Sequence, residues 1–213
     1  MESQEDYKQT LTDIRNLMAH SARFHSLSGL AGISSGILAL AGVTIFCLRF
    51  SFGLFDPLFN VSHDAVLFLL WDGLAVLLCS LLSAFWFTRR NAAKNGEKLW
   101  TPLFRRILLY WLLPMIAGGT LLLAFFGGNE AIQLPTAIAL TLVFYGLALV
   151  NASRFSLDEL FRMGIIQLAL GLIAFFLWKY SLLFWTAGFG FVNLVYGIIL
   201  FSKYERNRSK KES

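Results

Sequence analysis

The sequence predicts an all-α membrane protein with six transmembrane helices arranged as three hairpins. Hydrophobic residues make up 57% of the 213-residue chain and charged residues only 15%, whereas soluble domains carry about 25% charged residues. The apolar residues come in blocks of about 20, the length that crosses a ~30 Å hydrocarbon core in a helix. Because these blocks are continuously apolar and do not alternate, they argue against a transmembrane β-barrel.

The first segment, 1–26, is polar and predicts an amphipathic helix at the cytoplasmic face. Its apolar residues fall at helical spacing on one side, namely Tyr7, Leu11, Ile14, Leu17 and Met18. Such a helix can lie in the membrane interface, where it either packs on its own membrane domain or docks a partner protein. We expect no cleavable signal peptide, because the first apolar block starts near Leu27 and is too long for one.

The membrane domain, 27–202, contains the six expected spans: 27–48, 65–88, 102–126, 135–152, 157–178 and 181–201. Thr101-Pro102 has the pattern of an N-cap followed by Pro at the first helical position and starts the third span. Asp56-Pro57 has the same pattern and predicts a short interfacial helix in the first outer loop. Ser156-Leu-Asp-Glu159 reads as a capping box that starts the fifth span. Pro114 interrupts the third span, so we expect a kink there and a candidate hinge.

The lysines and arginines predict the orientation of the bundle. With both termini in the cytoplasm, 16 of the 18 basic residues lie on the cytoplasmic side, including the tail 203–213, and only Arg49 and Lys179 lie outside. This asymmetry follows the positive-inside rule. The net charge of +5 is thereby explained by topology, so no nucleic-acid partner is expected.

The first span contains a GxxxG pattern, Gly32 to Gly36, which lets two helix backbones approach closely. Two interpretations are open: tight packing within this chain, or a homo-oligomer contact. A faint similarity links this stretch to Asn193–Gly197 in the sixth span, where a polar residue leads and a glycine with two aliphatic residues follows.

Asp72 is an ionisable residue inside the second span. Its insertion costs about 2.5–3.5 kcal/mol at a helix centre, which the apolar residues around it offset. At helical spacing on its side lie small residues, namely Ala65, Ala75, Cys79 and Ser83, so we expect it to face the protein interior. Three interpretations are open: an ion pair with Arg49, a protonated and hydrogen-bonded carboxyl, or a cavity site for a proton, cation or substrate.

Other polar residues in the spans are Asn193, Gln167, Tyr145 and Tyr196, which serve either as interhelical hydrogen bonds or as a ligand site. All three histidines lie outside the spans, which argues against a transmembrane haem or metal site. No catalytic motif is present, and we expect no enzyme activity, no cofactor and no metal. Cys47 and Cys79 would lie roughly 20 Å apart in depth, too far for a disulfide.

Several stretches resemble a family of six-span bacterial inner-membrane proteins with no assigned activity. These are Phe144 to Ser153, Gly188 to Gly197 with Lys203-Tyr204-Glu205, and Ser28 to Gly32 after a soluble helix, together with the basic loop after the second span. The resemblance covers nearly the whole chain and implies the same topology. It also implies a multi-pass protein of the inner (plasma) membrane.

Two functional hypotheses follow. The first is a non-enzymatic integral membrane protein with a sensing, regulatory or assembly role, in contact with membrane lipid and with a protein partner or second copy through the N-terminal helix or the GxxxG face. The alternative is a small proton- or cation-coupled transporter that uses Asp72, with the candidate polar site formed by Asp72, Arg49 and Asn193 and the hinge at Pro114.

Overall fold

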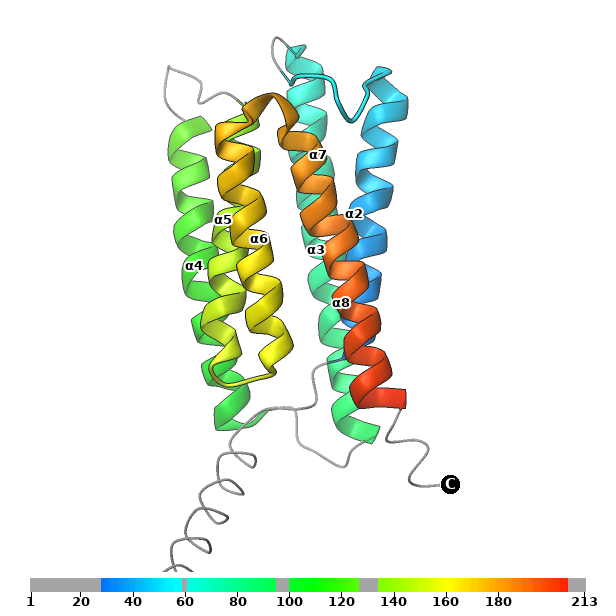
Figure 1. Ribbon diagram of the computed structural model, residues 1–213, viewed down its shortest axis with the longest axis vertical. Coiled ribbons are helices and arrows are strands. Elements are labelled where there is room, and N and C mark those ends of the chain that lie inside the picture. Colours follow the sequence, from blue (N-terminus) through cyan, green and yellow to red (C-terminus); the bar gives the residue numbers. More distant parts are fainter. Residues whose placement is uncertain (1–27, 59–60, 95–99, 127–133, 207–213) are drawn as a thin grey trace, which may run out of the picture.

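The computed structural model describes residues 28–58, 61–94, 100–126 and 134–206. Among these residues there are helices and no strands, and six of the helices are long and apolar enough to cross a membrane. Consecutive spans run in opposite directions along the bundle (Figure 1). The all-α, six-span fold class is thereby confirmed. The expected N-terminal helix and the end of the basic tail lie outside the described residues.

The spans begin and end close to their predicted positions. The first five are α2 (Gly29–Phe50), α3 (His63–Lys94), α4 (Pro102–Phe126), α5 (Leu134–Ser153) and α6 (Asp158–Phe176). After a 3₁₀ turn at Trp178–Tyr180, the last span consists of α7 (Ser181–Trp185), the π-helical η2 (Thr186–Val192), α8 (Asn193–Leu200) and the π-helical η3 (Phe201–Arg206). The largest difference is in α3, which continues past the predicted end at 88 to Lys94.

The local start signals had mixed outcomes. The signal at Thr101-Pro102 is confirmed, because α4 begins at Pro102 and the amide of Phe104 donates to the Thr101 hydroxyl at 3.2 Å. The capping box with Ser156 as N-cap is wrong by one residue, since Leu157 holds the N-cap position without a side-chain cap.

The short helix predicted after Asp56 is also wrong. Residues 51–58 form turns, and the Asp56 carboxylate accepts a hydrogen bond from the amide of Gly53 at 2.6 Å. The amide of Asp56 in turn donates to the Gly53 carbonyl at 3.1 Å. Asp56 therefore closes a turn with the residues before it and caps nothing after it.

Pro114 does not end the helix, because α4 continues through this residue as one helix, and the kink and hinge expected there stay predictions. Pro114 is buried, as is Gly118 one turn further on. A Cβ added to Gly118 would overlap the ring of Phe144 on α5. Close packing on α5 therefore stabilises α4 on the side where Pro114 removes a backbone hydrogen bond.

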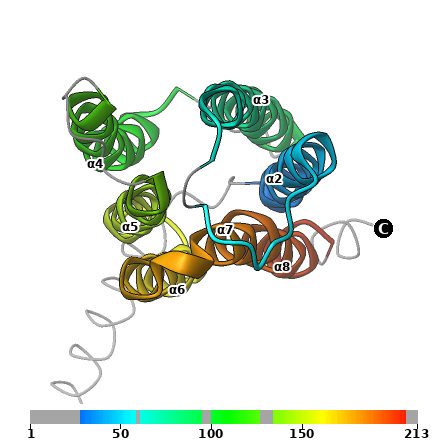
Figure 2. The same cartoon turned by 90° about the horizontal axis from the view of Figure 1, so that it is seen from above.

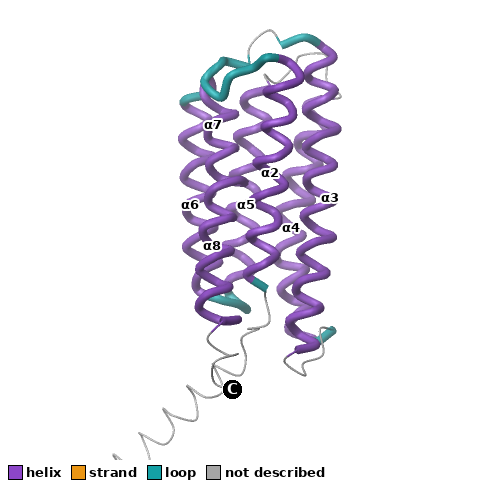
Figure 3. Tube along the Cα trace, turned by 90° about the vertical axis from the view of Figure 1, so that its right-hand side faces the viewer, coloured by secondary structure: helices purple, strands orange, loops and turns teal. Residues whose placement is uncertain are grey.

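Seen from above, the spans form an open ring (Figure 2). The last span packs against α2, α5 and α6, while α5 also packs against α4, and α2 against α3. The helices run side by side with their connections at the two ends of the bundle (Figure 3). The two ends of the ring are α3 and α4. In the apolar stretch of α3 that is long enough to cross a membrane, only 6% of the residues are buried, against 44% in that of α5. Helix α3 therefore lies at the edge of the fold.

Candidate functional site

The polar side chains that the sequence analysis proposed as site residues lie in two separate regions of the bundle. One lies between α2 and α3 around Asp72, and the other lies where α5, α6 and the last span meet, around Asn193. The candidate site residues Asp72, Arg49 and Asn193 are therefore not brought together into one site.

Asp72 packs against a glycine of α2. A Cβ added to Gly42 would lie 2.8 Å from Oδ2 of Asp72, so the missing side chain makes room for the carboxylate. Asp72 is half-buried, and within the described part of the chain its carboxylate has no ion pair and no hydrogen bond. Gly42 is visible in the sequence as a small residue within the first span, but the sequence does not reveal that it faces Asp72.

Arg49 does not reach Asp72. Its guanidinium carbon lies 5.6 Å from the centroid of its neighbour Phe50, and no ion pair joins it to Asp72. Arg49 is two turns beyond Gly42, about 10 Å along α2. Phe68 lies one turn before Asp72, toward the N-terminal end of α3. Its ring meets that of Phe50 edge-on, with the ring centroids 5.4 Å apart. At this end of α2 and α3 the described contact is therefore between two aromatic rings.

The small-residue side of α3 is only half covered. Ala65 is buried, and Ser83 lies against α2, where its Oγ is 3.0 Å from Oγ of Ser34. Ala75 and Cys79, one and two turns from Asp72, are exposed. Both cysteines are free. Asp72 thus sits at the boundary between the surface that contacts α2 and an open surface of α3.

The second polar group joins three helices. Tyr145 on α5 donates a hydrogen bond to Oδ1 of Asn193 at 3.3 Å. Gln167 on α6 donates from Nε2 to the Gly188 carbonyl at 2.8 Å and to Oδ1 of Asn193 at 3.4 Å. Gln167 is fully buried and Asn193 is 3% exposed. These contacts fit the interpretation of these residues as interhelical hydrogen bonds.

The π-helical segment η2 places Gly188 beside Gln167, and this was not predictable from the sequence. A Cβ added to Gly188 would overlap Oε1 of Gln167 and the Leu142 side chain, so a larger residue would require the ends of both side chains to shift. Oε1 of Gln167 is buried and has no hydrogen-bond partner among the described residues. The α-helix resumes at Asn193, which ends the π turn at the residue that accepts both side-chain hydrogen bonds.

The glycines of the GxxxG pattern face the last span of the same chain. A Cβ added to Gly32 would lie 2.8 Å from the Cα of Gly197, and one added to Gly36 would lie 2.8 Å from the Gly190 carbonyl oxygen. The two stretches with faint sequence similarity therefore pack on each other, running in opposite directions. These contacts correspond to the first of the two interpretations of Gly32 and Gly36, tight packing within this chain.

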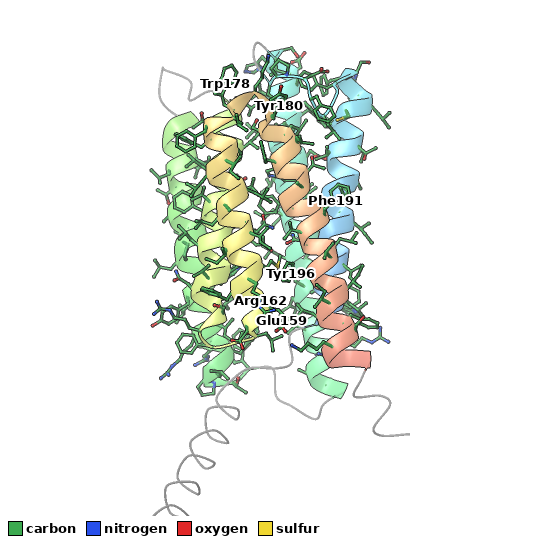
Figure 4. The ribbon with its side chains drawn as sticks, in the orientation of Figure 1. Glu159, Arg162, Trp178, Tyr180, Phe191 and Tyr196 are labelled. Atoms are coloured by element: carbon green, nitrogen blue, oxygen red, sulfur yellow. The ribbon has the colours of Figure 1, made fainter. Side chains whose placement is uncertain are left out.

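One further pair was missed by sequence reasoning. Nζ of Lys203, in η3, lies 2.5 Å from Oε1 of Glu159, whose side chain is 6% exposed while that of Lys203 is 57% exposed. Glu159 stands at the start of α6, at the end of the bundle that carries the α5–α6 turn (Figure 4). The sequence could have indicated this pair, because Glu159 begins the fifth span and Lys203 ends the sixth, which places both residues at the same end of the bundle.

The chain matches no family model, no curated protein and no solved structure. The resemblance to six-span inner-membrane proteins therefore stays a prediction from the sequence stretches that carry it.

Proposed function

We propose that this integral membrane protein is non-enzymatic and has an assembly or regulatory role in the inner (plasma) membrane of a bacterial cell. In this role it binds a transmembrane helix of another protein, or of a second copy, along the open side of α3. The observation that carries the proposal is the carboxylate of Asp72. It lies within a span and has no ion pair or hydrogen bond with any of the described residues.

An unpaired carboxylate in a membrane is expensive, and such residues almost always pair or face a water-filled cavity. Asp72 lies nine residues from the first residue of α3, about 14 Å along the helix axis, well inside the span. Arg49 lies over the ring of Phe50 and makes no ion pair with Asp72. A basic or hydrogen-bonding residue on a partner helix would satisfy the carboxylate.

The surroundings of Asp72 suit a helix partner. Ala75 and Cys79 are small and exposed beside it, and small residues let two membrane helices approach closely. Since α3 packs extensively on α2 alone, its other sides are available for contact within the bilayer. The GxxxG face is less suitable, because Gly32 and Gly36 already contact the last span.

The test compares two charge-removing variants of one helix. The tagged protein is purified in mild detergent as the unmodified chain, as Asp72→Asn and as Asp64→Asn, which removes the same charge from the exposed first turn of α3. We expect a stoichiometric partner or a defined oligomer that is lost in Asp72→Asn and kept in Asp64→Asn. A monomer without a partner in all three preparations would refute the proposal.

The native Cys79 identifies which partner is present. In Cys47→Ser, Cys79 is the single cysteine of the chain, two turns or about 10 Å from Asp72. Oxidative crosslinking in membranes yields a disulfide-linked dimer if a second copy lies along α3. A crosslink to a different chain indicates a heteromeric partner.

The second candidate function is a proton- or cation-coupled transporter. It is favoured by the same half-buried, unpaired carboxylate on the least covered helix. In proteoliposomes, proton-linked flux would be abolished in Asp72→Asn and kept in Asp64→Asn. Flux that is equal in both variants, or absent in the unmodified protein, excludes this alternative.

A further inference from the structure

A groove of about 290 Å³ lies between α2 and the last span. Residues at helical spacing on α2, including Leu40, Val43 and Cys47, form one wall. Phe52 and Leu54, from the turns after α2, close one end. The groove is on the opposite side of α2 from Arg49, and it is independent of the proposed function at Asp72.

The polar groups in the groove are already satisfied. The hydroxyl of Thr44 donates to the Leu40 carbonyl at 2.7 Å, and that of Thr186 donates to the Leu182 carbonyl at 2.8 Å. Both bonds stay within the helix of the threonine, so neither hydroxyl hydrogen is available to a ligand. The remaining wall residues are aliphatic, aromatic or a thiol. The lining therefore carries no charge and no free hydroxyl donor, which favours an apolar occupant over an ion or a polar solute.

The mouth of the groove opens toward the bilayer. Leu48 on α2 is 78% exposed and Phe191 on the last span is 58% exposed, and Phe191 projects from the last span toward α2 in Figure 4. Both residues lie within membrane spans, where the surrounding medium is hydrocarbon.

We infer that the groove binds one hydrocarbon chain of a membrane lipid. Its volume is at the lower end of the roughly 300–1,000 Å³ typical of ligand sites, and a helix about 10 Å wide could not enter it. A linear chain fits both the size and the lining. The acyl chain has apolar surroundings both in the bilayer and in the groove, so hydrophobicity alone does not favour the groove. Close packing against the groove walls provides the preference.

The experiment uses the full-length protein in liposomes that contain a phospholipid with a diazirine midway along one acyl chain. After irradiation, mass spectrometry of peptides locates the crosslinks. We expect labelling in the groove, at Cys47 and Phe191, to exceed labelling at Phe176, which is 80% exposed on α6. Labelling that simply follows exposure would overturn the inference, and this arm requires no variant.

Two neighbouring substitutions on α2 sharpen the test. Thr44→Trp fills the groove, whereas Ile45→Trp adds the same ring at a residue that is 53% exposed and outside the groove lining. Crosslinks at Phe191 should be lost in Thr44→Trp and kept in Ile45→Trp, with thermal unfolding as a folding check. Thr44→Val should keep them, because the hydroxyl is not used by the ligand. Crosslinks that survive in Thr44→Trp, or disappear in Thr44→Val, contradict the inference.

Discussion

The contact between α2 and α8 yields the sharpest stability prediction, at Gly197. A Cβ added to Gly197 would overlap the backbone nitrogen of Ile33 and would lie 2.7 Å from the carbonyl carbon of Gly32. Neither atom belongs to a side chain that could rotate away. Gly197→Ala must therefore push the two helices apart over the length of their contact.

The expected magnitude follows from two opposing terms. Overpacking of a close contact costs about 1–3 kcal/mol, and backbone atoms on the opposite side place this site near the upper limit. Replacing Gly by Ala inside a helix contributes about 0.8–1.0 kcal/mol of propensity. The net loss is about 2 kcal/mol, which reduces the ratio of folded to unfolded protein about 30-fold.

Gly73 on α3 provides the matched control, because a Cβ added there meets no atom within 4 Å. Gly73→Ala should therefore leave stability unchanged or raise it by up to about 1 kcal/mol. Reversible unfolding in mixed micelles, followed by circular dichroism, measures both variants. If Gly197→Ala is as stable as Gly73→Ala, the close α2–α8 contact described above is refuted.

Three further predictions concern the polar pairs. Lys203→Met removes the ammonium that faces the buried Glu159 carboxylate and should lower stability by about 1–2 kcal/mol, less than a fully buried pair because the lysine is exposed; the same unfolding assay measures this loss, and adding Glu159→Gln should restore part of it. Tyr145→Phe removes one interhelical hydrogen bond and should cost about 0.6 kcal/mol, and never more than about 1.7, when unfolding is titrated with denaturant. Asp72→Asn keeps the size of the side chain and breaks no hydrogen bond of the described residues, so the melting temperature of its monomer should match that of the unmodified monomer; a clear loss between the two monomers would indicate an internal partner for Asp72, whereas loss of a bound partner lowers stability only in the assembled protein.

The sequence predicted the spans well because each one must cover the hydrocarbon core with apolar residues. The same physics explains why helix neighbours could not be predicted. In a bilayer, helix surfaces that face lipid and those that face other helices are both apolar. Hydrophobic periodicity in the sequence therefore does not reveal which helices are neighbours. It indicates neither the contact of Gly32 with Gly197 nor the packing of α3 on α2 alone.

The candidate polar site was predicted only residue by residue. Asp72 and Asn193 were identified from their chemistry, and both lie in the membrane as expected. The pairing of Arg49 with Asp72 was predicted from side-chain reach alone, and the sequence carries no sign that Arg49 lies over the ring of Phe50 instead. The π-helical register that positions Gly188 against Gln167 depends on packing, so helical periodicity could not reveal it.

The length of α3 has a mechanical consequence. Its 32 residues span about 48 Å, more than the ~30 Å hydrocarbon core, so its basic end, with Arg89 and Arg90, projects past the acyl chains. From Asp72 to Arg90 the helix is a stiff arm of about 27 Å, attached mainly to α2. A 10° pivot at Asp72 would move the two arginines by about 5 Å across the headgroups, converting an event in the bilayer into a displacement of charge at its surface.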